Sequence, residues 1–171
     1  MTGLKGVQEF FFEGMARGWA AGNNGSPIPD FPGWSEVVYE DPRRFAGYVL
    51  VDRWGRDPDT GKSSGSTTIT RFGVPLWVTW YGGGSYEKLA LPLLKQALME
   101  NYHIGIFNGG RGPREYPQQN LRYVNQAKGD FVRFSGTEYI QDIDEDVGLG
   151  FHEYWGGSLL YLKKTSESVG I

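Results

Sequence analysis

Hydrophobic and polar positions follow two different periods along this chain, and each change of period marks a change of element. The apolar residues between positions 4 and 18 recur at helical spacing, which predicts an amphipathic helix over residues 3–19 with Thr2 as its cap. A second helical stripe, rich in leucine and alanine, predicts a helix over residues 86–101. Pro92 falls inside that stripe, so we expect it either to kink this helix or to mark its first turn.

The remaining apolar runs are short, alternating, and rich in β-branched and aromatic residues, which is typical of strands. The predicted strands are residues 35–40, 44–52, 66–72, 74–81, 121–126, 131–134, 137–142 and 149–162, the last with a break at Gly156-Gly157. Residues 20–33 and 53–66 are predicted as loops because they are rich in glycine and polar residues, and 57–61 has strong turn chemistry. Residues 71–74 are predicted as a tight turn.

The resulting order is helix, four strands, helix, four strands, which predicts an α+β domain of 171 residues with two helices packed on antiparallel sheet. Two short motifs recur along this order: Arg44-Phe45-Ala46-Gly47 with Arg133-Phe134-Ser135-Gly136, and Trp80-Tyr81-Gly82 with Tyr154-Trp155-Gly156. We interpret them as an internal duplication of a helix-plus-four-strand unit, with repeats at residues 3–84 and 85–162. The alternative is chance similarity between aromatic strands that end in glycine.

Composition narrows the class of protein further. The chain contains no cysteine, which removes disulfides, thiolate zinc sites and thiol nucleophiles, and fits a reducing compartment. No secretory leader and no long apolar window are recognisable, so we expect a cytoplasmic protein without a membrane segment. The net charge of −3 argues against direct nucleic-acid binding, although a local basic patch is compatible with it. Neither a cofactor nor a metal is expected.

Three motifs bear on chemistry. Gly61-Lys62-Ser63 lacks the spacing and the following helix of a phosphate-binding loop, so we interpret it as an exposed turn. The acidic run from Asp142 to Glu153 resembles a calcium loop, but the sixth position is Val147 instead of glycine, which favours an acidic hairpin. The glycine-rich segment 109–116 carries Arg111 and Arg114, which could clamp a carboxylate or phosphate or could be a solvated connection.

The last strand places His152 and Tyr154 on one face, and Glu153 with its aromatic neighbours on the other. If the second face is the core, Glu153 is a buried carboxylate whose pKa would be raised unless a cation pairs with it. If that face is solvent, Glu153 is an ordinary surface residue.

The motifs from Arg44 to Gly157, together with Pro75-Leu76-Trp77 and Arg111 to Tyr116, resemble an uncharacterised bacterial domain family. Members of this family occur alone or behind a helix-turn-helix in Xre-type transcriptional regulators. The resemblance implies no catalytic residue, and no helix-turn-helix fits before Leu4, so operator contact is not expected. It implies, by analogy, a domain that senses a small molecule, as gyrase-inhibitor-like effector domains do.

The sequence therefore predicts a non-catalytic domain that binds a small molecule or peptide in an aromatic cleft. The predicted binding residues are Trp77, Trp80, Tyr81, Tyr154 and Trp155, with Glu153, Arg44, Arg133 and Arg114 as polar contacts. One alternative is an enzyme with Glu153 or Glu138 as acid or base and an arginine as its partner. The other is a module that binds another protein through its aromatic surface.

Overall fold

The structure is a computed structural model that describes residues 3–160, and within this range it confirms the predicted α+β class. The helical elements are α1 (Leu4–Met15), the 3₁₀ helices η1 (Trp19–Ala21) and η2 (Lys88–Ala90), and α2 (Leu91–Ile104). The strands are β1 (Ser26–Pro27), β2 (Trp34–Tyr39), β3 (Tyr48–Arg56), β4 (Lys62–Arg71), β5 (Val74–Ser85), β6 (Glu115–Gln118), β7 (Leu121–Gly129), β8 (Arg133–Asp142) and β9 (Val147–Ser158).

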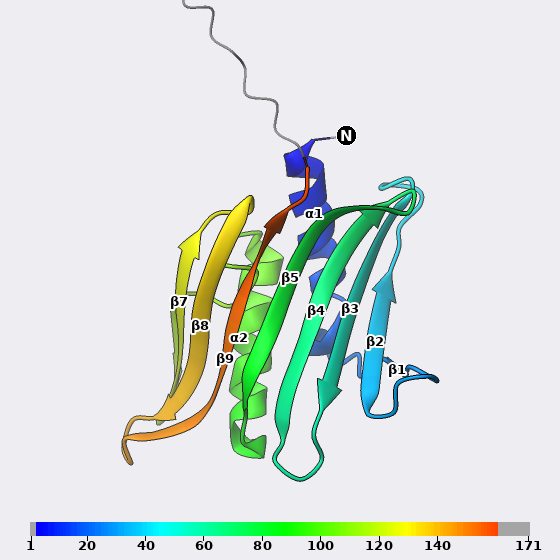
Figure 1. The fold of residues 1–171 in the computed structure, drawn as a ribbon. Helices are drawn as coiled ribbons and strands as arrows, with labels where there is room; N and C mark the ends of the chain where they lie inside the picture. The colour runs from blue at the N-terminus through cyan, green and yellow to red at the C-terminus, as the bar shows by residue number, and fades with distance from the viewer. Residues whose placement is uncertain (1–2, 161–171) are drawn as a thin grey trace, which may run out of the picture.

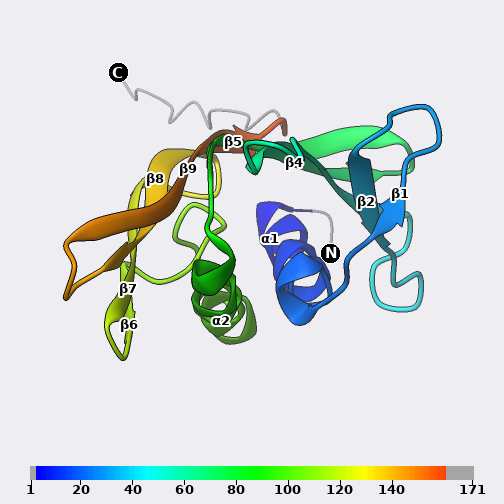
Figure 2. The same cartoon turned by 90° about the horizontal axis from the view of Figure 1, so that it is seen from below.

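All of these strands pair antiparallel in one sheet with the order β1-β2-β3-β4-β5-β9-β8-β7-β6 (Figure 1). The sheet therefore consists of two consecutive meanders, β1 to β5 and β6 to β9, joined where β5 pairs with β9. Both α-helices lie on the same face of the curved sheet (Figure 2), which we call the inner face. The opposite face is called the outer face.

The helices are close to the predicted ranges and differ at their ends. α1 begins after Gly3, which has an extended backbone and makes no side-chain cap, and Thr2 lies outside the described residues. The helix ends at Met15 instead of Trp19, because residues 16–18 form a turn that leads into η1. Pro92 lies in the first turn of α2, where its missing N–H costs no hydrogen bond, so the first-turn interpretation is confirmed.

The predicted loop over residues 53–66 is too long. β3 continues to Arg56 and β4 begins at Lys62, so only residues 57–61 form the turn. An Asp57 carboxylate oxygen holds that turn by accepting hydrogen bonds from the backbone N–H and hydroxyl of Thr60, each at 2.7 Å. The strand ends pair through their backbones and carry few apolar side chains. The alternating apolar pattern that predicts a strand is therefore missing there.

Two predicted breaks are also wrong. The predicted strands 131–134 and 137–142 are mostly one strand, β8, because Gly136 pairs with both β7 and β9. Glycine is needed there because a Cβ would lie 2.3 Å from the Tyr154 hydroxyl. β9 likewise continues through Gly156 and Gly157, which pair with β5 and β8. The short strands β1 and β6 were not predicted, and residues 161–162 of the last predicted strand lie outside the described range.

Of the two repeated motif pairs, one occupies equivalent positions in the sheet and the other does not. The glycine-ended aromatic motifs lie side by side at the centre of the sheet, with Trp80 opposite Trp155 and Tyr81 opposite Tyr154. In contrast, the segment from Arg44 precedes β3, whereas the segment from Arg133 begins β8. The internal duplication stays a prediction.

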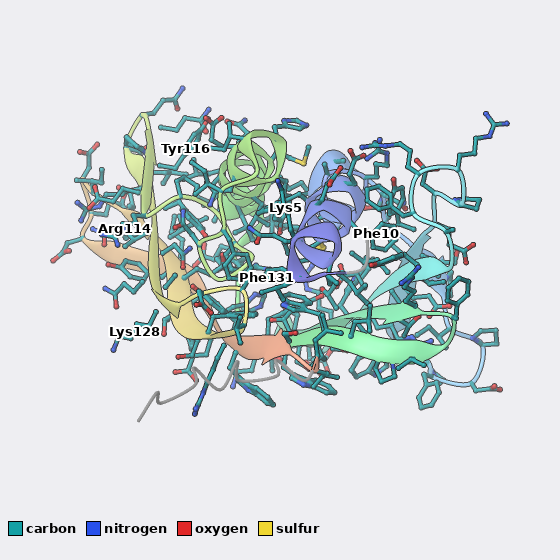
Figure 3. All side chains as sticks on the ribbon, turned by 90° about the horizontal axis from the view of Figure 1, so that it is seen from above. Lys5, Phe10, Arg114, Tyr116, Lys128 and Phe131 are labelled. Carbon is teal, nitrogen blue, oxygen red and sulfur yellow. The ribbon has the colours of Figure 1, made fainter. Side chains whose placement is uncertain are left out.

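The core fills the space between the inner face and the two helices. Trp77 of β5 is fully buried there and stacks on Phe131 and Phe134, with ring centroids 5.0 and 5.5 Å apart. Phe11 of α1 packs against the same indole at 4.8 Å. Figure 3 shows Phe131 between the sheet and the ends of both helices, so one aromatic cluster joins the two meanders to both helices.

We predict that Trp77→Ala lowers the free energy of unfolding by about 3–5 kcal/mol, because it leaves a cavity beneath both helices. Trp80→Ala, three residues along the same strand but half exposed on the outer face, should cost about 1 kcal/mol or less. Urea denaturation at neutral pH measures both values. Equal losses for the two variants would contradict the assignment of faces.

Candidate functional site

A pocket of about 620 Å³ lies between the inner face of the sheet and the helices. It opens beside the end of α1, η1 and the first turns of α2. Its walls are mostly apolar and aromatic, and include Met15, Trp19, Trp54, Leu91, Leu94 and Leu98. Five polar residues, which we call the floor, come from four strands and one loop: Asp52, Ser63, Tyr81, Arg111 and His152.

One floor residue, Arg111, belongs to a buried ion pair. Glu138 of β8 is fully buried, and its Oε1 atom accepts a hydrogen bond from the Arg111 guanidinium. Its Oε2 atom accepts a hydrogen bond of 2.7 Å from the Tyr123 hydroxyl. Both carboxylate oxygens are therefore occupied by donors within the protein.

This environment sets the charge of Glu138. Burial would raise the pKa of its carboxyl, but the Arg111 charge, the neighbouring His152 ring and the Arg111 hydrogen bond outweigh burial and lower this pKa to about 2. Glu138 is therefore ionised at neutral pH and is poorly suited to exchange protons there. This property argues against Glu138 as the acid or base of an enzyme.

Arg111 reaches the floor because the loop that carries it is tightly held. Gly109 and Gly110 both have positive φ, and a Cβ on Gly109 would lie 2.4 Å from the Tyr154 ring. The Asn101 side chain donates a hydrogen bond of 2.8 Å to the Arg111 carbonyl. The Tyr102 hydroxyl donates one of 3.2 Å to the Gly110 carbonyl. The guanidinium is thus fixed before any ligand arrives.

A second buried carboxyl, Asp52 of β3, lies at the other side of the floor. Its Oδ1 atom accepts hydrogen bonds from Thr67 at 2.8 Å and from the Tyr81 hydroxyl at 3.0 Å. Burial raises the pKa of this carboxyl above its ordinary value, although both hydrogen bonds act against the rise. The Arg111 guanidinium lies over the Tyr81 ring at 5.4 Å and connects the two halves of the floor.

Ser63 and His152 share a hydrogen bond of 2.9 Å between Oγ and Nε2. Ser63 lies where the pairing of β4 with β5 shifts register, and such bulges redirect side chains. The order serine, histidine, glutamate is that of a hydrolase triad. However, His152 Nδ1 is 3.7 Å from Glu138 Oε1, beyond hydrogen-bond distance, and Arg111 already occupies that oxygen. The triad geometry is therefore incomplete, because Glu138 lies near the histidine ring without a hydrogen bond of normal length to it.

Comparison with known proteins identifies the family to which the chain belongs. A family described as "Domain of unknown function (DUF5680)" matches residues 60–159, more than half of the sequence. The chain belongs to this DUF5680 family. No curated protein and no solved structure matches it.

The segment that matches DUF5680 contains four of the five floor residues and also Glu138. Asp52, α1 and η1 precede it, so the pocket is completed by residues outside the matched segment. Among residues 3–160, no group of three or more histidine, aspartate or glutamate side chains is arranged to hold a metal ion. None of the helices in the same range is long and apolar enough to cross a membrane.

The residues predicted for one aromatic cleft divide between the two faces of the DUF5680 sheet. Tyr81 is on the pocket floor, Trp77 is in the core, and the Tyr154 hydroxyl donates a hydrogen bond of 2.5 Å to Asn125. Trp80 and Trp155 stack on the outer face at 6.1 Å. With Glu153 they line a shallower depression of about 350 Å³, so the face that carries Glu153 is the exposed one.

The predicted arginine contacts lie outside the pocket. Arg44 is exposed and pairs with Glu13 of α1 at 2.7 Å. Arg133 is exposed at the start of β8, and Arg114 is exposed just before β6. Figure 3 shows Arg114 near the β6–β7 edge of the sheet, far from the space between the helices. The structure therefore does not bring these arginines together.

Sequence reasoning did not select Asp52, Ser63 or His152 for binding, and it considered Glu138 only as a catalytic alternative. Arg111 was noted on its glycine-rich loop but was not among the predicted binding residues. The one signal that pointed to the pocket was strand parity, since His152 and Tyr154 share the buried face of β9. The strand pairing that brings the other floor residues together produces no pattern in the sequence.

We predict that Glu138→Gln costs about 3–5 kcal/mol of unfolding free energy, because it leaves the Arg111 charge buried without its counter-ion. The double variant Arg111→Met/Glu138→Leu should be closer to the wild type than Glu138→Gln is. Urea denaturation of the three proteins checks this order. A single variant that loses less than about 1 kcal/mol would refute the pairing as an energetic unit.

A second prediction concerns pH. Because the pKa of Glu138 is lowered in the folded state, this group contributes stability above its ordinary pKa and loses it as pH falls through about 2. The lowering from 4.5 to about 2 corresponds to roughly 3 kcal/mol. The wild type should lose this amount more than Arg111→Met/Glu138→Leu between about pH 5 and pH 2. Parallel stability curves for the two proteins would contradict it.

Proposed function

We propose that this DUF5680 domain binds a small molecule with an apolar body in the pocket between α1, α2 and the sheet, without transforming it. The observation that carries the proposal is the pocket itself. Its volume of about 620 Å³ lies within the usual range of ligand sites, roughly 300–1,000 Å³. Apolar walls with a few fixed polar groups are the common composition of such sites.

The floor supports binding because it is already organised. Asp52, Tyr81 and Arg111 are each held by a hydrogen bond or ion pair from the surrounding protein. A ligand that meets fixed groups loses less free energy in ordering them, so affinity is higher for the same contact area. The low pKa of Glu138 and the long His152–Glu138 distance favour binding over catalysis.

The biological setting that we propose follows the family resemblance. Related domains behind a helix-turn-helix imply that a DUF5680 domain reports the presence of its ligand, as the effector part of a bacterial transcriptional regulator. We place this chain in the bacterial cytoplasm, with a small-molecule ligand and without direct contact to nucleic acid or membrane. The net charge of −3 supports the absence of nucleic-acid contact.

We predict that Ala20→Trp, which adds a ring where η1 borders the pocket, abolishes binding of the neutral fluorescent probe phenylnaphthylamine. Ala46→Trp, at an exposed position outside the pocket, should bind as the wild type does. Titration by fluorescence checks both variants, and circular dichroism checks their fold. Native mass spectrometry of protein purified from cells should show a copurified molecule that Ala20→Trp lacks. Unchanged probe affinity in Ala20→Trp would refute the pocket assignment.

A second candidate function is binding to another protein through the outer face. Trp80 and Trp155 are 47% and 59% exposed, and Trp34 and Phe151 are also partly exposed large rings. Exposed aromatic residues that cluster are typical of interaction sites. The same native mass spectra test this candidate. An assembly larger than one chain that Trp80→Ala dissociates would favour it over the pocket.

A further inference from the structure

The positive charge around the pocket is concentrated at its opening. Three exposed or half-exposed cations, which we call the rim, belong to the lining: Arg56 of β3, Lys88 of η2 and Lys95 of α2. No carboxylate within residues 3–160 lies within 4.0 Å of any of the three rim nitrogen groups, whereas other arginines of the same range do form such pairs. The rim charges are therefore available to an incoming group.

The floor does not have the excess positive charge of the rim. The Arg111 charge is balanced by Glu138, and the other charged floor residue is Asp52, whose pKa is raised by burial. The lining as a whole holds four arginine or lysine residues and one carboxylate. Because the complete chain has a net charge of −3, the rim is a local reversal of the protein's charge. Such a reversal attracts anions to the opening of the pocket.

The geometry of η2 and α2 explains why the rim and the apolar wall coincide. Lys88, Leu91, Lys95 and Leu98 are spaced by three, four and three residues, so they follow one stripe that faces the pocket. Lys95 lies over the Trp19 ring at 4.5 Å, a cation–π contact that holds its ammonium group beside the opening. The amino-terminal end of α2 borders the same opening and adds partial positive charge.

We infer that the ligand is an amphipathic anion, with one carboxylate, sulfonate or similar group held at the rim and an apolar body inserted between the walls. This inference rests on the proposed function and specifies its ligand class. The Lys88 and Lys95 ammonium groups and the Arg56 guanidinium bind the anionic group, and the Trp19 and Leu98 side chains contact the body. A cationic ligand is disfavoured, because it would meet three unpaired cations before it reached Asp52.

The test compares two probes with the same ring skeleton. Anilinonaphthalene sulfonate carries an anionic group, and phenylnaphthylamine does not. The wild type should bind the sulfonate at least about tenfold more tightly than the neutral probe at low salt, and this advantage should shrink as salt is raised. Ala20→Trp should abolish binding of both probes. Decanoate, but not decanol, should displace the sulfonate efficiently.

The variant Lys88→Gln/Lys95→Gln should lose the preference for the sulfonate and keep its affinity for the neutral probe. Lys88→Glu alone, which changes an exposed side chain without touching the Trp19 contact, should weaken sulfonate binding in the same direction. Lys128→Glu is the matched control, because Lys128 is exposed on β7, outside the pocket lining, near the sheet edge seen in Figure 3. It should leave both affinities unchanged.

Each outcome separates the inference from the proposed function. Binding of the neutral probe that Ala20→Trp removes, with no sulfonate preference or no effect of the rim variants, would overturn the anionic ligand and leave the pocket function standing. Failure of both probes to bind would overturn both. Equal weakening of sulfonate binding by Lys128→Glu and by Lys88→Glu would show a general charge effect and would also overturn the inference.

Discussion

The buried ion pair between Arg111 and Glu138 is the interaction on which the arrangement of this domain depends. It connects the loop after α2 to β8, the third strand of the second meander, through residues that are 27 positions apart in sequence. A pair of this kind gains little net stability, because the desolvation of two charges offsets their attraction. Its value lies in its geometry, since either charge alone would be costly to bury. The pair therefore requires β8, the glycine-rich loop and α2 to meet in one way.

From this constraint the pocket follows. The ion pair with Glu138 holds the Arg111 guanidinium under the helices, where it forms part of the floor. The guanidinium lies over the Tyr81 ring, and the Tyr81 hydroxyl donates a hydrogen bond to Asp52. The same network occupies both oxygens of the Glu138 carboxylate and one oxygen of the Asp52 carboxylate. Apart from Trp54 of β3, the apolar walls come from the helices, which bury their inner stripes against the sheet but leave space where α1 ends and η1 begins. A binding site thus arises where the core is incomplete, next to its most rigid polar cluster.

The inner face of the sheet carries the pocket floor and the core, and the outer face carries an exposed aromatic pair. Side chains alternate between these faces along the two central strands, β5 and β9. Parity assigns Trp77, Tyr81 and Tyr154 to the inner face and Trp80, Glu153 and Trp155 to the outer face. Aromatic residues that are neighbours in sequence are therefore separated by the thickness of the sheet. Like residues meet across the strands instead, with Trp80 opposite Trp155. They form a second aromatic surface, on the face of the sheet opposite to α1 and α2.

The sequence by itself determined the elements that depend on local periodicity and turn chemistry. Both helices, the turn at Asp57–Gly61 and the antiparallel α+β class follow from side-chain spacing, because helices and strands bury one face at a fixed period. It also determined that no thiol chemistry is available. Only the tertiary structure decided where strands run through glycine, as at Gly136, because the Tyr154 ring that needs the space comes from another strand. Only the tertiary structure joined Asp52, Ser63, Arg111 and His152 into one floor and left Lys88, Lys95 and Arg56 around its opening. Apart from Lys88 and Lys95, which share one helical stripe, these groups lie far apart along the chain, and the pairing and burial that bring them together leave no local pattern in the sequence.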